Sequence, residues 1–203
     1  MLSIVVIALI LLYSIILHEL AHGKVAELMG DPTARLAGRL TLNPLPHLDP
    51  LGTLLPLLLM LTGAPLVFGW AKPVPINPYN FRDQDKGMLM VSSAGIVTNL
   101  FIAWLLGLVL RFLPETNTYL AQVLLYGVRI NVVLAVFNLI PIPPLDGSRL
   151  FAAVLPYRFQ EYMYRLEQYG LIILFMLLLF PPTEMLLSYI IDLVCRLLAP
   201  GFF

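Results

Sequence analysis

A long apolar segment with ionisable side chains inside it constrains this chain more than any other feature. Residues 2–29 are apolar enough to form a helix across the hydrocarbon core of a bilayer, about 30 Å thick, and Gly30-Asp31-Pro32 ends it. His18, Glu19 and His22 lie within this segment. Because each such group costs about 2.5–3.5 kcal/mol in a membrane helix, three of them within about one turn predict a function that uses them.

These three residues form the pattern H-E-x-x-H. Positions i and i+4 share one helix face, so both imidazoles can bind the same metal ion. Glu19 could then accept a proton from a water molecule bound to that metal. The pattern alone is short, and in a soluble helix two surface histidines are the simpler interpretation. The membrane setting favours a metal site.

The composition is that of a polytopic membrane protein: 60% of the 203 residues are hydrophobic and 12% are charged, about half the charged fraction of soluble domains. The net charge of zero gives no argument for a nucleic-acid partner. Cys195, the one cysteine, cannot form an intrachain disulfide, and we expect it to be an apolar filler. The N-terminus lacks the basic region and cleavage site of a signal peptide, so a retained helix is expected. We expect a single integral-membrane domain over 1–203.

The apolar segments and prolines predict an all-α polytopic fold with about five to six membrane helices. After the first segment, apolar runs occupy 87–112, 118–140, 169–180 and 185–198. Between them, the proline-rich residues 33–86 predict a membrane-associated insert of short β-strands plus a half-length or re-entrant helix at 51–61. We expect the core to cover 1–150 and accessory helices to cover 151–203.

The basic residues predict the orientation. If the first helix ends in the cytoplasm, most of them are cytoplasmic, Arg196 included, whereas Arg111 borders an outer loop. We therefore expect a multi-pass protein of the cell membrane whose histidines lie nearer the cytoplasmic face. Arg129, in the middle of an apolar run, is expected to pair with an acid or to extend toward the interface.

Asp146 is the candidate third metal ligand. A catalytic zinc takes three protein ligands and a water, and Asp146 ends a proline-broken stretch after an apolar run. The alternative is that Asp146 caps the next helix. Because a site with two histidines needs a third donor, the interpretation of Asp146 as a metal ligand is favoured. His47 and Asp49 form H-x-D beside prolines, where a role near the site and a simple interfacial turn are both open.

Three motifs resemble those of site-2 proteases, which are intramembrane zinc metalloproteases: H-E-L-A-H-G at 18–23, S-A-G-x-x-x-N at 93–99 and N-x-x-P-x-P-P-L-D-G at 138–147. Residues 39–78 are similar to a compact prokaryotic branch of that family, which lacks PDZ-like and CBS-like domains. The small residues at 92–95 also predict close packing of helices.

The resemblance implies that zinc is bound by His18, His22 and Asp146, with Glu19 as the general base. Substrate-backbone binding or oxyanion stabilisation would then fall to Asn138 and Asn99. His47, which the resemblance does not assign, is a further candidate for this role. The expected partners are a transmembrane protein substrate and membrane lipids, and a homo-oligomer is left open. The extended segments at 39–44 and 66–78 are predicted to pair with an unwound substrate by strand addition.

Two other classes of function are alternatives to an intramembrane protease. A membrane metal-binding or transport protein could use the same histidine and aspartate ligands, but transport does not require Glu19 between them, and the sequence shows no series of metal sites along a path. A protease-like binding protein without activity has no support, since all four presumed catalytic positions are filled.

Overall fold

The computed structural model describes residues 4–50, 52, 71–113, 118–155, 161, 163 and 165–203. Within these residues the regular structure is helical and no strand occurs. The all-α prediction is therefore confirmed, whereas the strands of the insert and the count of five to six membrane helices are not. The predicted half-length helix at 51–61 lies outside the described residues except for Gly52.

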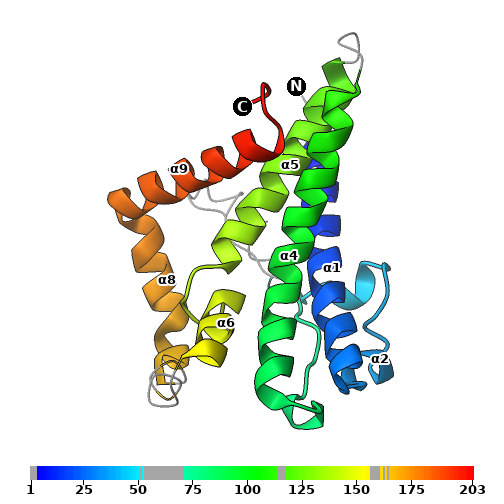
Figure 1. The fold of residues 1–203 in the computed structure, drawn as a ribbon, viewed down its shortest axis with the longest axis vertical. Helices are drawn as coiled ribbons and strands as arrows, with labels where there is room; N and C mark the ends of the chain where they lie inside the picture. Colours follow the sequence, from blue (N-terminus) through cyan, green and yellow to red (C-terminus); the bar gives the residue numbers. More distant parts are fainter. Residues whose placement is uncertain are drawn as a thin grey trace.

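Three long helices form the centre of the molecule: α1 (Ile4–Met29), α4 (Gln84–Arg111) and α5 (Thr118–Asn138). Each is long and apolar enough to cross a membrane. They run along the long axis, and α4 packs against both of the others (Figure 1). The buried cluster between α4 and α5 includes Ala103 and Val128, both fully buried. The spans are therefore joined by close side-chain packing.

The ends of α1 and α4 follow from local sequence. The helix α1 ends where Gly30 takes a φ of 115°, a conformation that favours glycine. At the start of α4, the Asp83 side chain accepts a hydrogen bond from the Lys86 N–H at 3.1 Å. The Arg82 N–H donates to the Met29 carbonyl at 2.9 Å, so α4 begins beside the end of α1. The two helices are therefore antiparallel.

The C-terminal part contains η3 (Glu167–Tyr169), α8 (Gly170–Leu179) and α9 (Pro181–Leu198). The helical stretch Glu167–Leu179, which joins η3 and α8, meets α9 at a bend of 83°. Only together are this stretch and α9 long and apolar enough to cross a membrane. The described residues therefore hold three candidate spans, or four if this bent pair is one. In Figure 1, α9 crosses the bundle obliquely against α5.

The end of α9 lies beside the end of α4. A Cβ added at Gly107 of α4 would lie 3.0 Å from the Leu198 carbonyl carbon. Because α4 begins beside the end of α1, this contact places Arg196 at the end of the bundle opposite Lys24. The expectation that both residues lie on the same side is wrong. A bend of 83°, which the apolar pattern does not reveal, directs α9 there.

The insert folds back on the end of α1. Its described residues form α2 (Thr33–Leu36), η1 (Leu45–His47) and η2 (Pro78–Asn80), with an irregular extended segment at 71–77. Asp31 anchors it.

The Asp31 carboxylate is fully buried and accepts hydrogen bonds from several groups of the insert. They come from the Asn77 N–H at 2.7 Å, the Asn80 side-chain amide at 2.8 Å, and both the backbone and the hydroxyl of Thr33. A second set of hydrogen bonds holds residue 72: Arg39 donates to the Lys72 carbonyl at 2.7 Å, and the Lys72 N–H donates to the His47 carbonyl at 2.9 Å.

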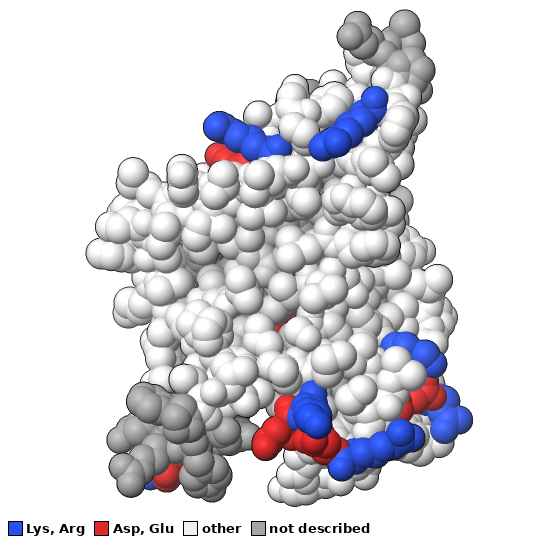
Figure 2. Space-filling view, in the orientation of Figure 1, with Lys and Arg blue, Asp and Glu red and all other residues white. Residues whose placement is uncertain are grey.

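Charged side chains gather near the two ends of the face shown in Figure 2, and the broad band between them is white except for one small acidic spot. This is the distribution expected of a protein embedded in a bilayer. At the end of α1, Glu27 pairs with Lys24 at 2.6 Å and with Arg35 at 2.8 Å. Within the span α5, Arg129 pairs with Asp192 of α9 at 3.2 Å, which confirms the expectation of an acidic partner.

Candidate metal centre

Side chains from two distant parts of the sequence meet at one point. His18 and His22 lie on one face of α1, and Asp146 is the first residue of α6 (Asp146–Val154). The helix α6 packs against α4, which in turn packs against α1. The distances from Nε2 of His18 and from Nε2 of His22 to Oδ2 of Asp146 are both 3.0 Å. The two Nε2 atoms are also 3.0 Å apart.

The chain after α5 turns sharply to present Asp146. A Cβ at Gly147 would lie 2.5 Å from the Ile140 carbonyl oxygen, so glycine is required for the backbone to fold back this closely. The N-cap of α6 is Leu145, and no side chain caps this helix. The alternative that Asp146 is a helix cap is therefore wrong, because its carboxylate faces the two histidines instead.

Hydrogen bonds on the far side of each ring determine the histidine tautomers. Nδ1 of His22 lies 2.7 Å from the Val91 carbonyl oxygen, which can only accept, so Nδ1 carries the proton. Nδ1 of His18 donates to Oδ1 of Asn99 at 2.5 Å. In both neutral rings Nε2 is therefore an unprotonated lone-pair donor. This is the arrangement seen in metal-bound histidines, whose other ring nitrogen is held by an acceptor.

The three converging atoms fit a metal ion. Two lone-pair nitrogens and a carboxylate oxygen repel one another at 3.0 Å unless a cation lies between them. Oδ2 of Asp146 is buried and has no hydrogen-bond partner. Ligands of a tetrahedral zinc at 2.0–2.1 Å would be about 3.3 Å apart, close to the observed spacing. Two imidazoles and one carboxylate form a donor set of catalytic zinc. Among the described residues, these three are the group that could hold a metal.

The general-base candidate is held by the insert. Oε2 of Glu19 accepts a hydrogen bond from the Val74 N–H at 2.8 Å, so the extended segment at 71–77 lies beside the site. Val74 and Val91 are not among the predicted site residues, since both act through backbone atoms that a residue pattern does not show. The prolines at 73 and 75, which indicate extended backbone, were the only available signal for Val74.

The other three predicted site residues, Asn99, Asn138 and His47, lie in three different surroundings. Asn99 is fully buried behind His18, on the side away from Asp146. The Asn138 side chain donates to the Leu134 carbonyl of its own helix at 2.9 Å. His47 is buried in the insert, where Nε2 donates to the Thr41 carbonyl at 2.9 Å. Substrate or oxyanion binding by these residues stays a prediction.

Gly95 explains the small-residue motif of α4. A Cβ at this position would lie 2.6 Å from both ring nitrogens of His18, so only glycine lets α4 lie flat against the imidazole. The predicted close packing is thus confirmed, and its consequence is to fix the position of His18, a candidate metal ligand.

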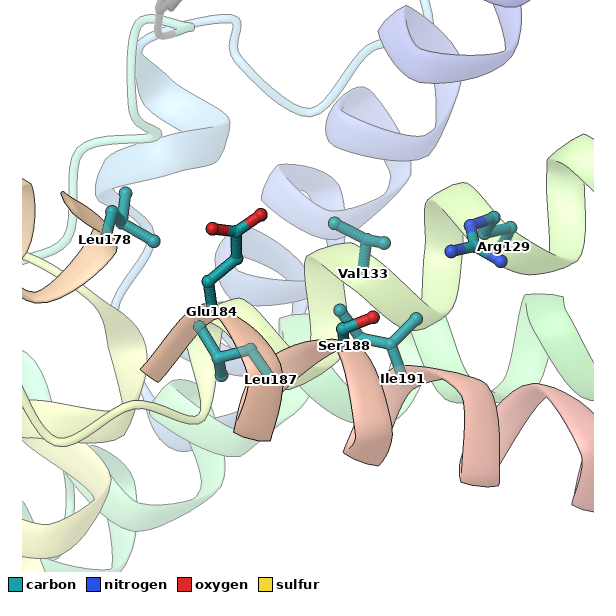
Figure 3. A pocket seen from close by; sticks show the side chains of 7 residues that line it. All are labelled: Arg129, Val133, Leu178, Glu184, Leu187, Ser188 and Ile191. Atoms are coloured by element: carbon teal, nitrogen blue, oxygen red, sulfur yellow. The ribbon is translucent and has the colours of Figure 1, made fainter. Parts of the chain in front are cut away.

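A surface groove lies elsewhere. It runs between α5 and α9, with Arg129 and Val133 on one side and Glu184, Ser188 and Ile191 on the other (Figure 3). None of the three candidate ligands, His18, His22 and Asp146, lines this groove, so the groove is separate from the candidate metal centre.

A helix long and apolar enough to cross a membrane, which brings two histidines and a glutamate together with an aspartate that could complete a set of metal ligands, is typical of a membrane-embedded zinc metalloprotease. Comparisons with known proteins agree. The model of peptidase family M50 matches residues 114–181.

Relatives extend the match to most of the chain. YwhC of Bacillus subtilis, which its name classes as a zinc metalloprotease, is 40% identical over 179 residues, covering 84% of this chain and 78% of YwhC. Two proteins named Rip2, from Mycolicibacterium smegmatis and Mycobacterium tuberculosis, are 33% identical over 84% of this chain and 65% of their own length. No solved structure matches the chain. The chain belongs to peptidase family M50, the site-2 proteases; it is a zinc metalloendopeptidase, and zinc is its cofactor.

Proposed function

We propose that the enzyme hydrolyses peptide bonds of transmembrane or membrane-proximal segments, with zinc held by His18, His22 and Asp146. One observation carries the proposal: two lone-pair nitrogens on a helix able to cross a membrane, those of His18 and His22, converge at 3.0 Å with a carboxylate oxygen of Asp146 from α6. A soluble substrate would have little access to such a site. The proposed domain is the whole chain, with its catalytic core at 1–150.

The residues divide the chemistry between them. Zinc, when bound, lowers the pKa of water toward about 7 and polarises the scissile carbonyl. Glu19 accepts a proton from the attacking water as its oxygen bonds to the carbonyl carbon. Glu19 then delivers that proton to the amide nitrogen as the C–N bond breaks, releasing an amine and a carboxylic acid that keeps the second proton of the water. The Val74 N–H engages only Oε2 of Glu19, which leaves Oε1 for the proton transfer.

We propose that the site opens toward the cytoplasmic side of the cell membrane. His18 lies about 17 Å along α1 from Met29 and about 21 Å from Ile4, at 1.5 Å per residue. The nearer end carries Lys24 and Arg35, and a concentration of basic residues favours the cytoplasm. Labelling single cysteines from one side of sealed vesicles tests this orientation. Exposure of position 35 only outside the cell would contradict it.

The extended segment at 71–77 is the proposed contact for an unwound substrate, because it runs beside Glu19. Replacing Ile76 by proline removes a backbone donor from this segment but leaves the Val74 N–H in place. We expect Ile76→Pro to raise KM while Ile76→Ala has little effect. Equal KM values for the two variants would contradict strand addition. The other proposed partners are lipids and, as an untested expectation, a second copy of the chain.

The decisive experiment uses the purified full chain in detergent with zinc and a panel of tagged single-span substrates. Wild type is compared with Glu19→Gln, and zinc content is measured on both. We expect cleavage by wild type and none by Glu19→Gln, with zinc bound to both. Bound zinc without cleavage of any substrate would favour metal transport, which zinc flux into liposomes would then test. Absence of zinc from both proteins would overturn the site.

A further inference from the structure

Two buried amide side chains form a hydrogen-bonded chain behind His18. Asn99 of α4 is fully buried and Asn131 of α5 is 1% exposed. Nδ2 of Asn99 donates to Oδ1 of Asn131 at 2.8 Å. Nδ2 of Asn131 donates to the Gly127 carbonyl and to the Ser14 hydroxyl, both at 2.9 Å. Buried amides cost free energy unless their hydrogen bonds are satisfied, and here the partners come from all three central helices.

The direction of every hydrogen bond in this series of amides follows from the last one, between Asn131 and the Gly127 carbonyl. A backbone carbonyl can only accept, so Gly127 requires Nδ2 of Asn131 to point toward it. Oδ1 of Asn131 then faces Asn99, which must present its Nδ2. Oδ1 of Asn99 therefore faces His18, and Nδ1 of His18 must be the protonated nitrogen.

We propose that Asn131 is a positioning residue of the zinc site: it fixes the orientation of the Asn99 amide and so holds His18 in the tautomer whose Nε2 faces the metal. The proposal rests on His18 being a zinc ligand, as proposed above. The hydrogen bonds given for Asn131 among the described residues join it to Asn99, Ser14 and Gly127, and it therefore acts on His18 through Asn99. Without it, the Asn99 amide is free to turn over and offer Nδ2 to His18. The ring would then move its proton to Nε2, which in that tautomer has no lone pair for zinc.

The other two histidines are internal controls. His22 is held by the Val91 carbonyl, which no side-chain substitution can turn over. His47 has the opposite tautomer, since Nε2 donates to the Thr41 carbonyl. The chain contains three histidines, so selective labelling gives one ring signal for each. A role of Asn131 in positioning changes only His18, whereas a general loss of packing changes all of them.

The test is ¹⁵N spectroscopy of histidine-labelled, zinc-free full chain in detergent micelles, together with zinc affinity measured by chelator competition. Wild type is expected to show Nδ1–H for His18 and His22 and Nε2–H for His47. Asn131→Leu, which is similar in size but cannot form hydrogen bonds, is expected to remove the Nδ1–H state of His18 alone. It should also weaken zinc binding about 10–100-fold. Where Asn131→Leu does not fold, Asn131→Ser is the second variant, because its rotatable hydroxyl imposes no orientation on Asn99.

Two controls separate positioning from stability. Val128→Ala, at a fully buried position of α5, should lower thermal stability and leave the His18 tautomer and zinc affinity unchanged. In an Asn99→Ala background, the substitution at Asn131 should cause no further loss of zinc affinity. If Asn131→Leu and Asn131→Ser leave both the zinc affinity and the His18 tautomer unchanged, the positioning role of Asn131 is overturned. The metal site itself would not be affected by that result. Failure of wild type to bind zinc would overturn the metal site itself.

Discussion

The backbone N–H of Val74 donates a hydrogen bond to Oε2 of Glu19 at 2.8 Å, although 55 residues separate the two in sequence. Val74 is 5% exposed, and a Cβ at Gly23 would lie 2.9 Å from its side chain, so the segment that carries it is pressed against α1. The insert therefore orients the carboxylate that the proposed mechanism uses as the base.

Val74→Pro tests this hydrogen bond directly. Proline has no N–H, and its fixed φ suits a segment that already has prolines at 73 and 75. A hydrogen bond to a charged group is worth about 1.5–3 kcal/mol, so we expect kcat to fall about 10–100-fold with zinc content unchanged. Val74→Ala, which keeps the N–H, is the matched control. Equal kcat values for the two variants would show that the hydrogen bond does not position Glu19.

Gly95→Ala should displace a metal ligand. The added methyl group would lie 2.6 Å from the ring nitrogens of His18, and the ring cannot move without leaving its place opposite Asp146. We expect zinc affinity, measured by chelator competition, to fall at least about 10-fold. Ser93→Ala, two residues earlier on the same helix, should bind zinc normally. Normal zinc affinity in Gly95→Ala would mean that α4 can shift away from α1.

Removal of zinc should destabilise the fold, because the ligands connect α1 with α6. A ligand at 100 times its Kd stabilises the folded state by about 2.7 kcal/mol, which corresponds to about 5–10 °C in Tm for a chain of this size. We expect a chelator to lower Tm of the wild type by this amount. Asp146→Asn should show no such shift, and Glu167→Gln, at an exposed position of η3, should keep it. A zinc-dependent Tm in Asp146→Asn would exclude Asp146 as a required ligand.

Asp31 should make stability depend on pH in the acid range. Burial by itself would raise the pKa of Asp31, but hydrogen bonds from Asn80, Thr33 and the Asn77 N–H outweigh it and hold the pKa below its ordinary value. A lowered pKa in the folded state means that the stabilisation is present above about pH 3.9 and is lost as the pH falls further. Asp31→Asn should therefore cost about 1.5–3 kcal/mol at pH 7 and much less near pH 3.

Thermal unfolding at the two pH values measures this difference. Asp85→Asn, at an exposed position in the first turn of α4, is the control, and its effect should be small at both pH values. A cost of Asp31→Asn that is equal at pH 7 and pH 3 would contradict the role of the ionised carboxylate.

The pair Arg129–Asp192 should show strong coupling. The two side chains are 3.2 Å apart and partly exposed on the surfaces of α5 and α9, two helices of apolar composition. Removing one partner leaves an unpaired charge in an apolar environment, so Arg129→Leu and Asp192→Leu should each destabilise the protein. The double variant should be more stable than either single variant, as measured by Tm in detergent. Additive losses would show that each charge reaches water independently.

The positions of the helices and the metal ligands could largely be predicted from sequence. The apolar run around His18 and His22 predicted a spanning helix with a metal site, because both its length and the cost of buried ionisable groups are local properties. The proline-broken stretch before Asp146 indicated the third ligand only once two histidines required one. For Asn138, Asn99 and His47 the sequence indicated the side chains but not what they bind.

Tertiary structure decided what surrounds these ligands. The Val91 and Val74 backbone groups that hold His22 and Glu19 have no sequence signature, because every non-proline residue carries the same N–H and C=O. The role of Asn131 depends on the order of contacts across three helices, which periodicity cannot express. The bend of 83° before α9 reversed the expected side of Arg196. Sequence alone thus determined which residues are candidate metal ligands, since their chemistry is costly elsewhere in a membrane. Only packing determined which neighbours orient them, since that depends on contacts between residues far apart in the chain.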